Sequence, residues 1–228
     1  MTDASAHPVS AGIEPRLFEH GQSGENLTLL EWRFPEPLLA VSSAPLGGGV
    51  GRRSWVINAQ VPRSYARLDP EAHLVELASE RGLSGPGVGM LTAVDLRETW
   101  RDEDGGAHVD VSVGITIPTW AAAPDQARDE APDPGGFVPG TINVVGLLPE
   151  RLSEAAMVNA VMSVTEAKAQ ALWDAGIAAT GTASDAVCVV CPDHGSPHAF
   201  GGPRSQWGAR LARAVHRAVL AGCRGARP

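Results

Sequence analysis

The chain has 228 residues, enough to bury a hydrophobic core in one large domain or two small ones. Its composition, with 43% hydrophobic and 19% charged residues, is ordinary for a soluble globular protein. The net charge of −8 and the lack of a dense basic run argue against a nucleic-acid partner.

The sequence shows no sign of secretion or of membrane insertion. The first dozen residues lack the basic and apolar regions of a signal peptide, and no apolar run approaches the ~20 residues that span a bilayer. The three cysteines are an odd number, which does not suggest a disulfide framework and fits a reducing compartment. We therefore expect a cytoplasmic protein without membrane contact.

The first part of the chain predicts mainly strands. Residues 1–24 are polar and rich in proline and glycine, so we expect a flexible tail. A Pro-Glu-Pro sequence predicts a break in the chain at 35–37. Asp69 as N-cap, Pro70 at the first helical position and Gly82 after the end predict a helix. Strands are expected at 27–34, 38–44, 53–61 and 87–95.

A hairpin and a long loop are expected in the middle of the chain. A turn at 101–106 precedes a strand at 108–117, whose alternation predicts one face on a core and the other toward solvent or a cleft. Segment 121–139 is rich in proline, glycine and aspartate, which predicts an exposed loop. A further strand is expected at 141–148.

A long helix in the second half is the best-marked element. Ser153 can cap its start, and Gly176 can take the left-handed position after its end. At 100° per residue, Glu166 lies in a polar stripe and Lys168 on the apolar side, about 160° away, so an undistorted helix cannot direct both into one small pocket. A lysine on a core face needs a partner or must extend to the rim, because an unpaired buried ammonium is costly.

The last elements are a strand at 186–192 and a helix at 205–220, followed by a tail at 223–228. The helix carries three arginines, at positions 210, 213 and 217, which we expect on a solvated outer face. Because hairpins come early and helices late, we predict an α/β protein in the α+β sense. The prediction is a single domain over 25–222, with mixed, largely antiparallel sheet layered with the long central helix and the C-terminal helix.

Several segments, taken together, resemble one enzyme family. In chain order they are SSAPLGGG from Ser42, NAQV from Asn58, GLSGPGVGMLTAVD from Gly82, GTINVV from Gly140, TEAKAQAL from Thr165, ATGTASDAVCVVCP from Ala179 and GGPRSQWG from Gly201. Each segment is a weak signal alone, but their order over most of the chain resembles the adenosylcobinamide amidohydrolases of corrinoid salvage. The resemblance implies hydrolysis of the linear amide that joins aminopropanol to a corrin propionate side chain. The products would be adenosylcobyric acid and 1-aminopropan-2-ol, in coenzyme B12 (cobalamin) salvage.

Such a reaction needs an activated nucleophile, donors for the oxyanion and an acid for the departing amine. Glu166 is the first candidate for a base that activates water, with a solvated helix face as the alternative. Lys168 is a candidate to hold the amide oxygen or to pair with a carboxylate. Asp185 is the second acid candidate. Thr182 is a candidate covalent nucleophile, although it lies in no GxSxG setting and no histidine is positioned to serve it.

Candidate substrate-binding residues lie in stretches rich in glycine, hydroxyl and amide groups. They are Ser42, Ser43, Gly47, Gly48, Asn58, Asn143, Thr180 and Ser184. Local turn chemistry, or capping of a strand end, is the alternative for these residues. The glycines would let backbone N–H groups approach a ligand, but the chain lacks the GK[ST] of a phosphate-binding loop. We expect Ser42, Asn143, Glu166 and Asp185 to line one pocket.

A cluster of cysteines and histidines near the last strand could also indicate a metal site. Cys188, Cys191, His194 and His198 are zinc-ligand types in the pattern C-x₂-C-x₂-H-x₃-H. The pairs are closer than in a Cys₂His₂ finger, and the two cysteines point to opposite faces of an extended strand. We therefore favour packing thiols and loop histidines, and predict no metal site.

The sequence also bears on cofactors, on oligomeric state and on alternative functions. The chain has no dinucleotide fingerprint, so we expect no organic cofactor and take the corrinoid as a small-molecule substrate. The sequence leaves open whether a divalent metal assists, whether water or a side chain attacks, and how many chains assemble. Two alternatives remain at this point: a corrinoid-binding protein without turnover, and an amidase for a smaller N-alkyl amide.

Overall fold

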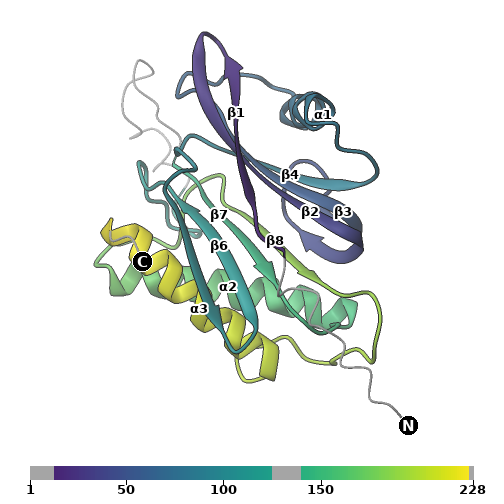
Figure 1. Cartoon of the computed structure of the whole chain (residues 1–228). Coiled ribbons are helices and arrows are strands. Elements are labelled where there is room, and N and C mark those ends of the chain that lie inside the picture. The colour runs from purple at the N-terminus through teal and green to yellow at the C-terminus, as the bar shows by residue number, and fades with distance from the viewer. Residues whose placement is uncertain (1–12, 125–139, 226–228) are drawn as a thin grey trace.

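The computed structural model describes residues 13–124 and 140–225 (Figure 1). In chain order its elements are β1 (Arg16–Gln22), β2 (Glu25–Ser42), β3 (Gly49–Gln60), α1 (Pro70–Glu80), β4 (Gly87–Thr92), β5 (Thr99–Asp104), β6 (Ala107–Val113), β7 (Ile142–Leu147), α2 (Glu154–Asp174), β8 (Ala186–Cys191) and α3 (Gln206–Arg224). No helix in these two ranges is both long and apolar enough to cross a membrane. Most of the expected exposed loop, and the outer parts of both expected tails, lie outside the described residues.

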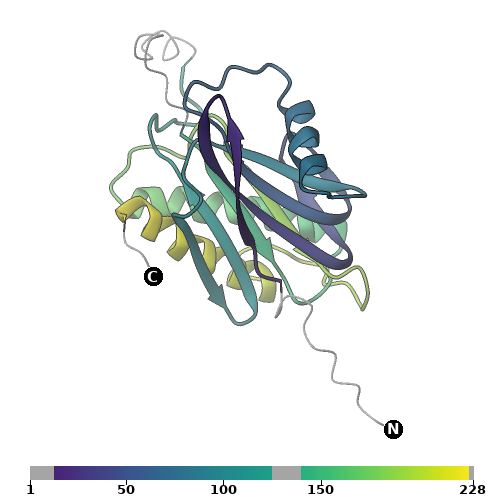
Figure 2. The same cartoon turned by 45° about the horizontal axis from the view of Figure 1, so that its top comes forward.

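All eight strands in the described ranges belong to one mixed sheet. Its order is β4-β3-β2-β8-β7-β6-β5, and β1 pairs with β2 outside this path. Only β3–β4 and β7–β8 are parallel among the strand pairs of the described residues, so the sheet is largely antiparallel. The α2 and α3 helices lie side by side across one face, and α1 lies beside β4 at the other end of the sheet (Figures 1 and 2). The predicted α+β class and the mixed, largely antiparallel character of the sheet are confirmed.

The longest strand of the sheet, β2, has an irregularity in its middle. The pairing of β2 with β3 shifts register between Arg33 and Leu38, across the Pro-Glu-Pro sequence. Proline cannot donate to the ladder, so the expected break appears as an irregularity within one long strand. Just before this irregularity, Trp32 packs in the same buried cluster as Val145 and Cys188. This cluster draws on β2, β3, β4, β7 and β8, so the sheet wraps around it.

The helix ends follow the predicted capping signals closely. The Ser153 hydroxyl accepts a hydrogen bond from the Ala156 amide at the start of α2, and Gly176 follows its end with φ of 78°. At the start of α1, Asp69 makes no side-chain cap because Arg67 engages its carboxylate. The α3 helix begins after Ser205 as expected, but it runs four residues beyond the predicted end, to Arg224.

Three expectations about local structure need correction. Residues 16–22 form β1, in register with β2, where we expected a tail; the pairing supplies hydrogen bonds that composition does not reveal. The turn before β6 is only Gly105–Gly106, both with positive φ, so residues 101–104 belong to β5. The following strand, β6, stops at Val113, four residues short of the predicted end.

The arginines of α3 lie on an outer face, as expected, where the side chains of Arg213 and Arg217 are 55% and 44% exposed, and they also contact a distant part of the fold. Arg213 donates to Asp104 at 2.7 and 2.8 Å, and Arg217 donates to Asp102 at 2.7 Å. Arg210 donates to the Gly105 carbonyl at 2.9 Å. These residues therefore tie α3 to the β5–β6 hairpin, a contact between segments about a hundred residues apart that helix periodicity does not predict.

Candidate active site

The central feature of the site is an ion pair between α2 and the start of β8. Lys168 is 7% exposed, on the face of α2 that packs toward the sheet, and its Nζ donates to Asp185 Oδ2. The side chains of the two residues are only 9% and 10% exposed. The pair supplies the partner that a lysine on an apolar helix face requires.

Asp185 is held by more than the lysine. Its Oδ1 accepts the Ile142 amide at 2.9 Å and the Thr182 hydroxyl, and its Oδ2 accepts the Thr182 amide at 3.0 Å. The carboxylate thus joins the start of β7, the turn before β8 and α2. Because Thr182 gives its hydroxyl proton to Asp185, its oxygen keeps lone pairs for another contact. Lys168, Thr182 and Asp185 are called the lysine–aspartate cluster below.

Gly181 lies directly against this cluster. A Cβ built on Gly181 would come 2.3 Å from Asp185 Oδ2 and 2.5 Å from Lys168 Nζ. On its other side the residue pairs with Thr119, whose amide donates to the Gly181 carbonyl at 2.8 Å. Only glycine at position 181 leaves room for both the segment that carries Thr119, called the Thr119 strap below, and the ion pair.

A second polar group, the asparagine network, lies on the strands next to the cluster. Asn143 Nδ2 donates to Asn58 Oδ1 and to the Leu91 carbonyl, both at 2.9 Å, and Asn58 Nδ2 donates to Ser112 Oγ at 3.1 Å. All three side chains are at least 97% buried. Asn143 Oδ1 is a buried acceptor with no hydrogen-bond partner among the described residues. Such groups are rare, which favours a functional site here.

The two polar groups are neighbours at one end of the sheet. Ile142, which donates to Asp185, directly precedes Asn143 on β7, and Asn143 pairs with Ala186, the residue after Asp185. The structure therefore brings together residues that the sequence places up to 127 positions apart, from Asn58 to Asp185.

The other hydroxyl candidates surround the cluster but are engaged with protein groups. Ser42 Oγ donates to the Val187 carbonyl, and Ser43 Oγ accepts the Val187 amide, both at 3.0 Å. Thr180 Oγ1 accepts the Ala121 amide at 2.8 Å. Ser184 Oγ lies 2.8 Å from the hydroxyl oxygen of Thr141. The two serines fix the start of β8 beside β2, and the other hydroxyls fix the loops around the turn.

Gly47 and Gly48 are not part of this group. Gly47 packs against the start of β4, where an added Cβ would lie 2.0 Å from the Gly87 carbonyl oxygen. Gly47 lines a cavity of about 470 Å³ that includes Arg53 and Trp55. The close approach of two backbone segments explains the glycine, where we expected an approach to a ligand.

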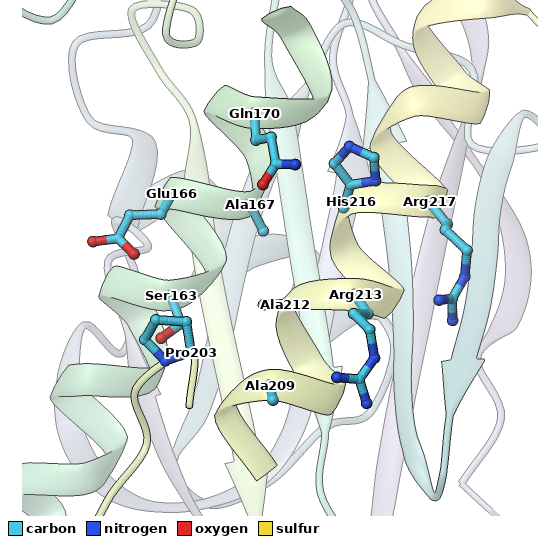
Figure 3. A pocket seen from close by; sticks show the side chains of 10 residues that line it. All are labelled: Ser163, Glu166, Ala167, Gln170, Pro203, Ala209, Ala212, Arg213, His216 and Arg217. Carbon is cyan, nitrogen blue, oxygen red and sulfur yellow. The ribbon is translucent and has the colours of Figure 1, made fainter. Parts of the chain in front are cut away.

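Glu166 lies in a different place from Lys168. It lines a groove of about 280 Å³ between α2 and α3, together with Gln170 and His216, over a floor that includes Ala167 and Ala212 (Figure 3). The expectation that Ser42, Asn143, Glu166 and Asp185 line one pocket is therefore wrong, because none of the other three lines this groove. Glu166 and Lys168 are separated because positions 166 and 168 point in nearly opposite directions on a regular helix. One of these two faces of α2 packs beside α3 and the other beside the sheet.

The cysteine–histidine pattern does not assemble in the structure. Cys188 and Cys191 belong to different buried clusters on the two faces of β8. Burial raises the pKa of their thiols to about 12 and about 11. This favours the protonated thiol, whereas zinc binds the thiolate. His198 instead contacts Glu150. Within the described residues, no three metal-ligating side chains converge.

Sequence reasoning missed several members of the site. Ser112, Thr119, Thr141 and Gly181 are not among the candidates that the sequence singles out. The alternation of residues 108–117 was the available signal, because it placed Ser112 on the face opposite the valines. The other three residues take part through loop pairing and close packing, which no local pattern reports.

Comparison with known proteins shows the family to which the chain belongs. A family model described as adenosylcobinamide amidohydrolase matches residues 14–227, nearly the whole chain. The chain belongs to this family. The lysine–aspartate cluster, the asparagine network and Gly181 all lie inside the matched region.

Two relatives of the family carry the same name. An adenosylcobinamide amidohydrolase of Methanosarcina mazei is 30% identical over 189 residues, covering 79% of this chain and 88% of the relative. One of Halobacterium salinarum is 29% identical over 177 residues, covering 76% of this chain and 75% of the relative. A crystal structure of a Pyrococcus horikoshii protein covers 86% of this chain and 77% of that protein, at 10% identity and a TM-score of 0.41, which is too distant to support an argument.

Proposed function

We propose that this protein hydrolyses adenosylcobinamide to adenosylcobyric acid and 1-aminopropan-2-ol, a reaction of cobalamin salvage. The observation that carries the proposal is membership of the amidohydrolase family across nearly the whole chain. The nearly buried lysine–aspartate cluster supports it, because it brings a cation from α2 against a carboxylate and a hydroxyl from the turn before β8.

Lys168 is proposed to bind the oxygen of the scissile amide. An ammonium has three N–H donors, and among the described residues Lys168 makes one hydrogen bond, to Asp185. A donor held in a largely dry site stabilises the negative charge that develops on the amide oxygen, and contributes most when it is already in place. The ion pair with Asp185 fixes the position of Nζ before substrate arrives.

Asp185 is proposed to take the proton of the attacking group. That group is either a water molecule or the Thr182 hydroxyl, which already donates to Asp185 Oδ1. Attack on the amide carbon forms a C–O bond and moves one proton to the carboxylate. The C–N bond then breaks, and the departing amine takes a proton from the same group. If Thr182 attacks, water hydrolyses the resulting ester in a second step.

Mass spectrometry of a reaction with adenosylcobinamide tests the proposal. Purified protein should yield adenosylcobyric acid and aminopropanol in equal amounts. We expect Asp185→Asn to lower kcat at least ~100-fold, in line with the loss of a general base. Glu166→Gln, a matched amide replacement on the other side of α2, should leave kcat within about 3-fold.

Other outcomes would point to other functions. Tight corrinoid binding without product, unchanged by Asp185→Asn, would identify a binding protein. Turnover of simple N-alkyl propionamides in preference to adenosylcobinamide would identify an amidase for smaller substrates. Either result would overturn the proposal.

A further inference from the structure

A cavity of about 470 Å³, called the α1 cavity below, lies between α1 and the first halves of β3 and β4. Two of the segments that resemble the family, those that begin at Ser42 and Gly82, supply part of its lining. The described residues that line it include none of the lysine–aspartate cluster or the asparagine network. Its volume is within the range of small-molecule sites, roughly 300–1,000 Å³. The amide chemistry proposed above therefore leaves a well-sized cavity unused.

The α1 cavity contains a cation whose charge is not neutralised by the described part of the chain. Arg53 lines the cavity and is half-buried. Its guanidinium donates only to backbone carbonyls among the described residues: to Gly47 at 2.9 Å, to Arg52 at 3.0 Å and, more weakly, to Gly48 at 3.5 Å. Carbonyl groups satisfy N–H donors but carry no net charge, so a counter-ion is missing here.

Arg53 differs in this respect from the other half-buried arginines of the described residues. Each of the others faces a carboxylate or the ring of a tryptophan. They are Arg67, Arg81 and Arg151, which form ion pairs, and Arg210, which lies over Trp207. The charge at position 53 is therefore not a general feature of the arginines in this fold.

The rest of the α1 cavity is mainly apolar, and hydrogen bonds fix one of its walls. The Trp55 indole N–H donates to the Ser84 carbonyl at 3.2 Å, and the Ser54 amide donates to the Pro86 carbonyl at 2.8 Å. On the α1 side, Val75 is 52% exposed, so apolar surface of this wall is open to solvent. The apolar lining residues are Leu46, Trp55, Val75, Ala78, Leu83 and Pro86. A preformed apolar cavity with one cation suits an anion carried on an apolar body.

We propose that the α1 cavity binds an organic monocarboxylate, with the carboxylate on the guanidinium of Arg53 and the apolar body between Trp55 and the α1 wall. The planar guanidinium fork matches the geometry of a carboxylate. Glu71 lines the same cavity, and its negative charge opposes a second charge on the ligand. The site therefore favours a carboxylate over a phosphate dianion. It does not depend on the proposed amide hydrolysis.

An NMR titration of the full chain with benzoate tests the inference. We expect saturable shifts of the backbone amide signals of Gly47, Gly85 and Gly87, which line the cavity, with a Kd below about 1 mM. Benzamide, a neutral ligand of nearly the same shape, should bind at least ~10-fold more weakly because it lacks the charge that Arg53 attracts. Phenyl phosphate, largely a dianion at pH 7.5, should also bind more weakly than benzoate.

Two neighbouring arginines give a matched pair of variants. Arg53→Met should lower the affinity for benzoate at least ~10-fold and leave the affinity for benzamide within about 2-fold. Arg52→Met is the control: Arg52 is exposed and pairs with Asp193, so the affinity for benzoate should stay within about 2-fold of wild type.

Charge changes on α1 test the site without removing any hydrogen bond of Arg53. Val75→Asp should bind benzoate about 5-fold more weakly than Val75→Asn, because the new carboxylate repels the ligand. Glu71→Gln removes a negative charge from the lining and should tighten benzoate binding about 2-fold or more. Both positions are exposed, so these variants decide the matter if Arg53→Met does not fold.

Several results would overturn the inference. They are no saturable binding of benzoate, equal affinities for benzoate and benzamide, tighter binding of phenyl phosphate, shifts confined to residues outside the cavity, equal losses in Arg53→Met and Arg52→Met, and equal affinities of Val75→Asp and Val75→Asn. Because the titration measures binding without turnover, its outcome is separate from that of the adenosylcobinamide assay.

Discussion

Lys168 and Asp185 form an ion pair between the middle of α2 and the start of β8, with both side chains about nine-tenths buried. Removing one member of such a pair leaves the other as an uncompensated charge in a poorly solvated place. The pair therefore links the stability of the fold to the chemistry of the site.

Replacement of the lysine should destabilise the protein. Lys168→Met keeps the length of the side chain but leaves the Asp185 carboxylate without its cation. We expect the free energy of unfolding, measured by urea denaturation, to fall by about 3 kcal/mol. Glu166→Gln, on the exposed side of the same helix, should change it by less than about 0.5 kcal/mol. Equal stability of Lys168→Met and wild type would show that the pair is not formed in solution.

A methyl group at position 181 should disturb the site directly. In Gly181→Ala the new Cβ would meet Asp185 Oδ2 at 2.3 Å and Lys168 Nζ at 2.5 Å, so the ion pair or the Thr119 strap must shift. We expect kcat for adenosylcobinamide to fall at least ~10-fold, as small displacements of catalytic groups are costly.

The matched control for this variant is Gly21→Ala. A Cβ on Gly21, in β1, would meet no atom within 4 Å. This variant should keep the kcat of wild type. A Gly181→Ala protein with wild-type kcat would contradict the assigned position of the site.

The asparagine network can be tested without changing side-chain shape. In Asn143→Asp, an oxygen replaces the amide nitrogen that donates to Asn58 and to the Leu91 carbonyl, so two hydrogen bonds are lost and acceptors face each other. We expect a loss of about 2–4 kcal/mol in the free energy of unfolding at pH 7. Gln170→Glu, an exposed amide-to-acid change on α2, should cost less than about 0.5 kcal/mol. Similar losses in the two variants would argue against a buried network.

The contact between α3 and the β5–β6 hairpin predicts a pH dependence. Hydrogen bonds from Arg213 and then Arg217 hold the pKa of Asp104 below its usual value. A carboxyl whose pKa is lower in the folded state adds stability above its unfolded pKa, and loses it as the pH falls through the folded pKa. Asp104→Asn should therefore cost stability at pH 7, by at most about 1 kcal/mol because the arginines are solvent-screened.

The cost of Asp104→Asn should shrink as the pH falls below about 4. Urea denaturation at a series of pH values measures it. Glu25→Gln changes an exposed carboxyl for which the described residues show no ion pair, and should give a small difference that does not follow this course. A cost of Asp104→Asn that stays constant down to pH 3 would contradict the assigned ion pairs.

Local signals in the sequence predicted the elements better than their contacts. Ser153 and Gly176 marked the ends of α2 because capping depends on residues within one turn. The two orientations of Glu166 and Lys168 followed from helix geometry alone, and the structure separates these residues accordingly.

The contacts that assemble the site depend on the folded chain. Asn58 and Asn143 meet across 85 positions because the sheet wraps around one buried cluster, and periodicity in the sequence does not predict that contact. Lys168 required a partner, but only the packing of α2 against the start of β8 selects Asp185. The pairing of Arg213 and Arg217 with the hairpin was missed for the same reason.

A structure of the Asp185→Asn protein with adenosylcobinamide bound would decide whether the lysine–aspartate cluster is the reaction site, because this variant should bind the substrate without cleaving it. We predict that the oxygen of the scissile amide lies within hydrogen-bond distance of Lys168 Nζ, with its carbon next to Thr182. A substrate that lies instead in the groove between α2 and α3, with its amide beside Glu166, would show that the reaction site is elsewhere.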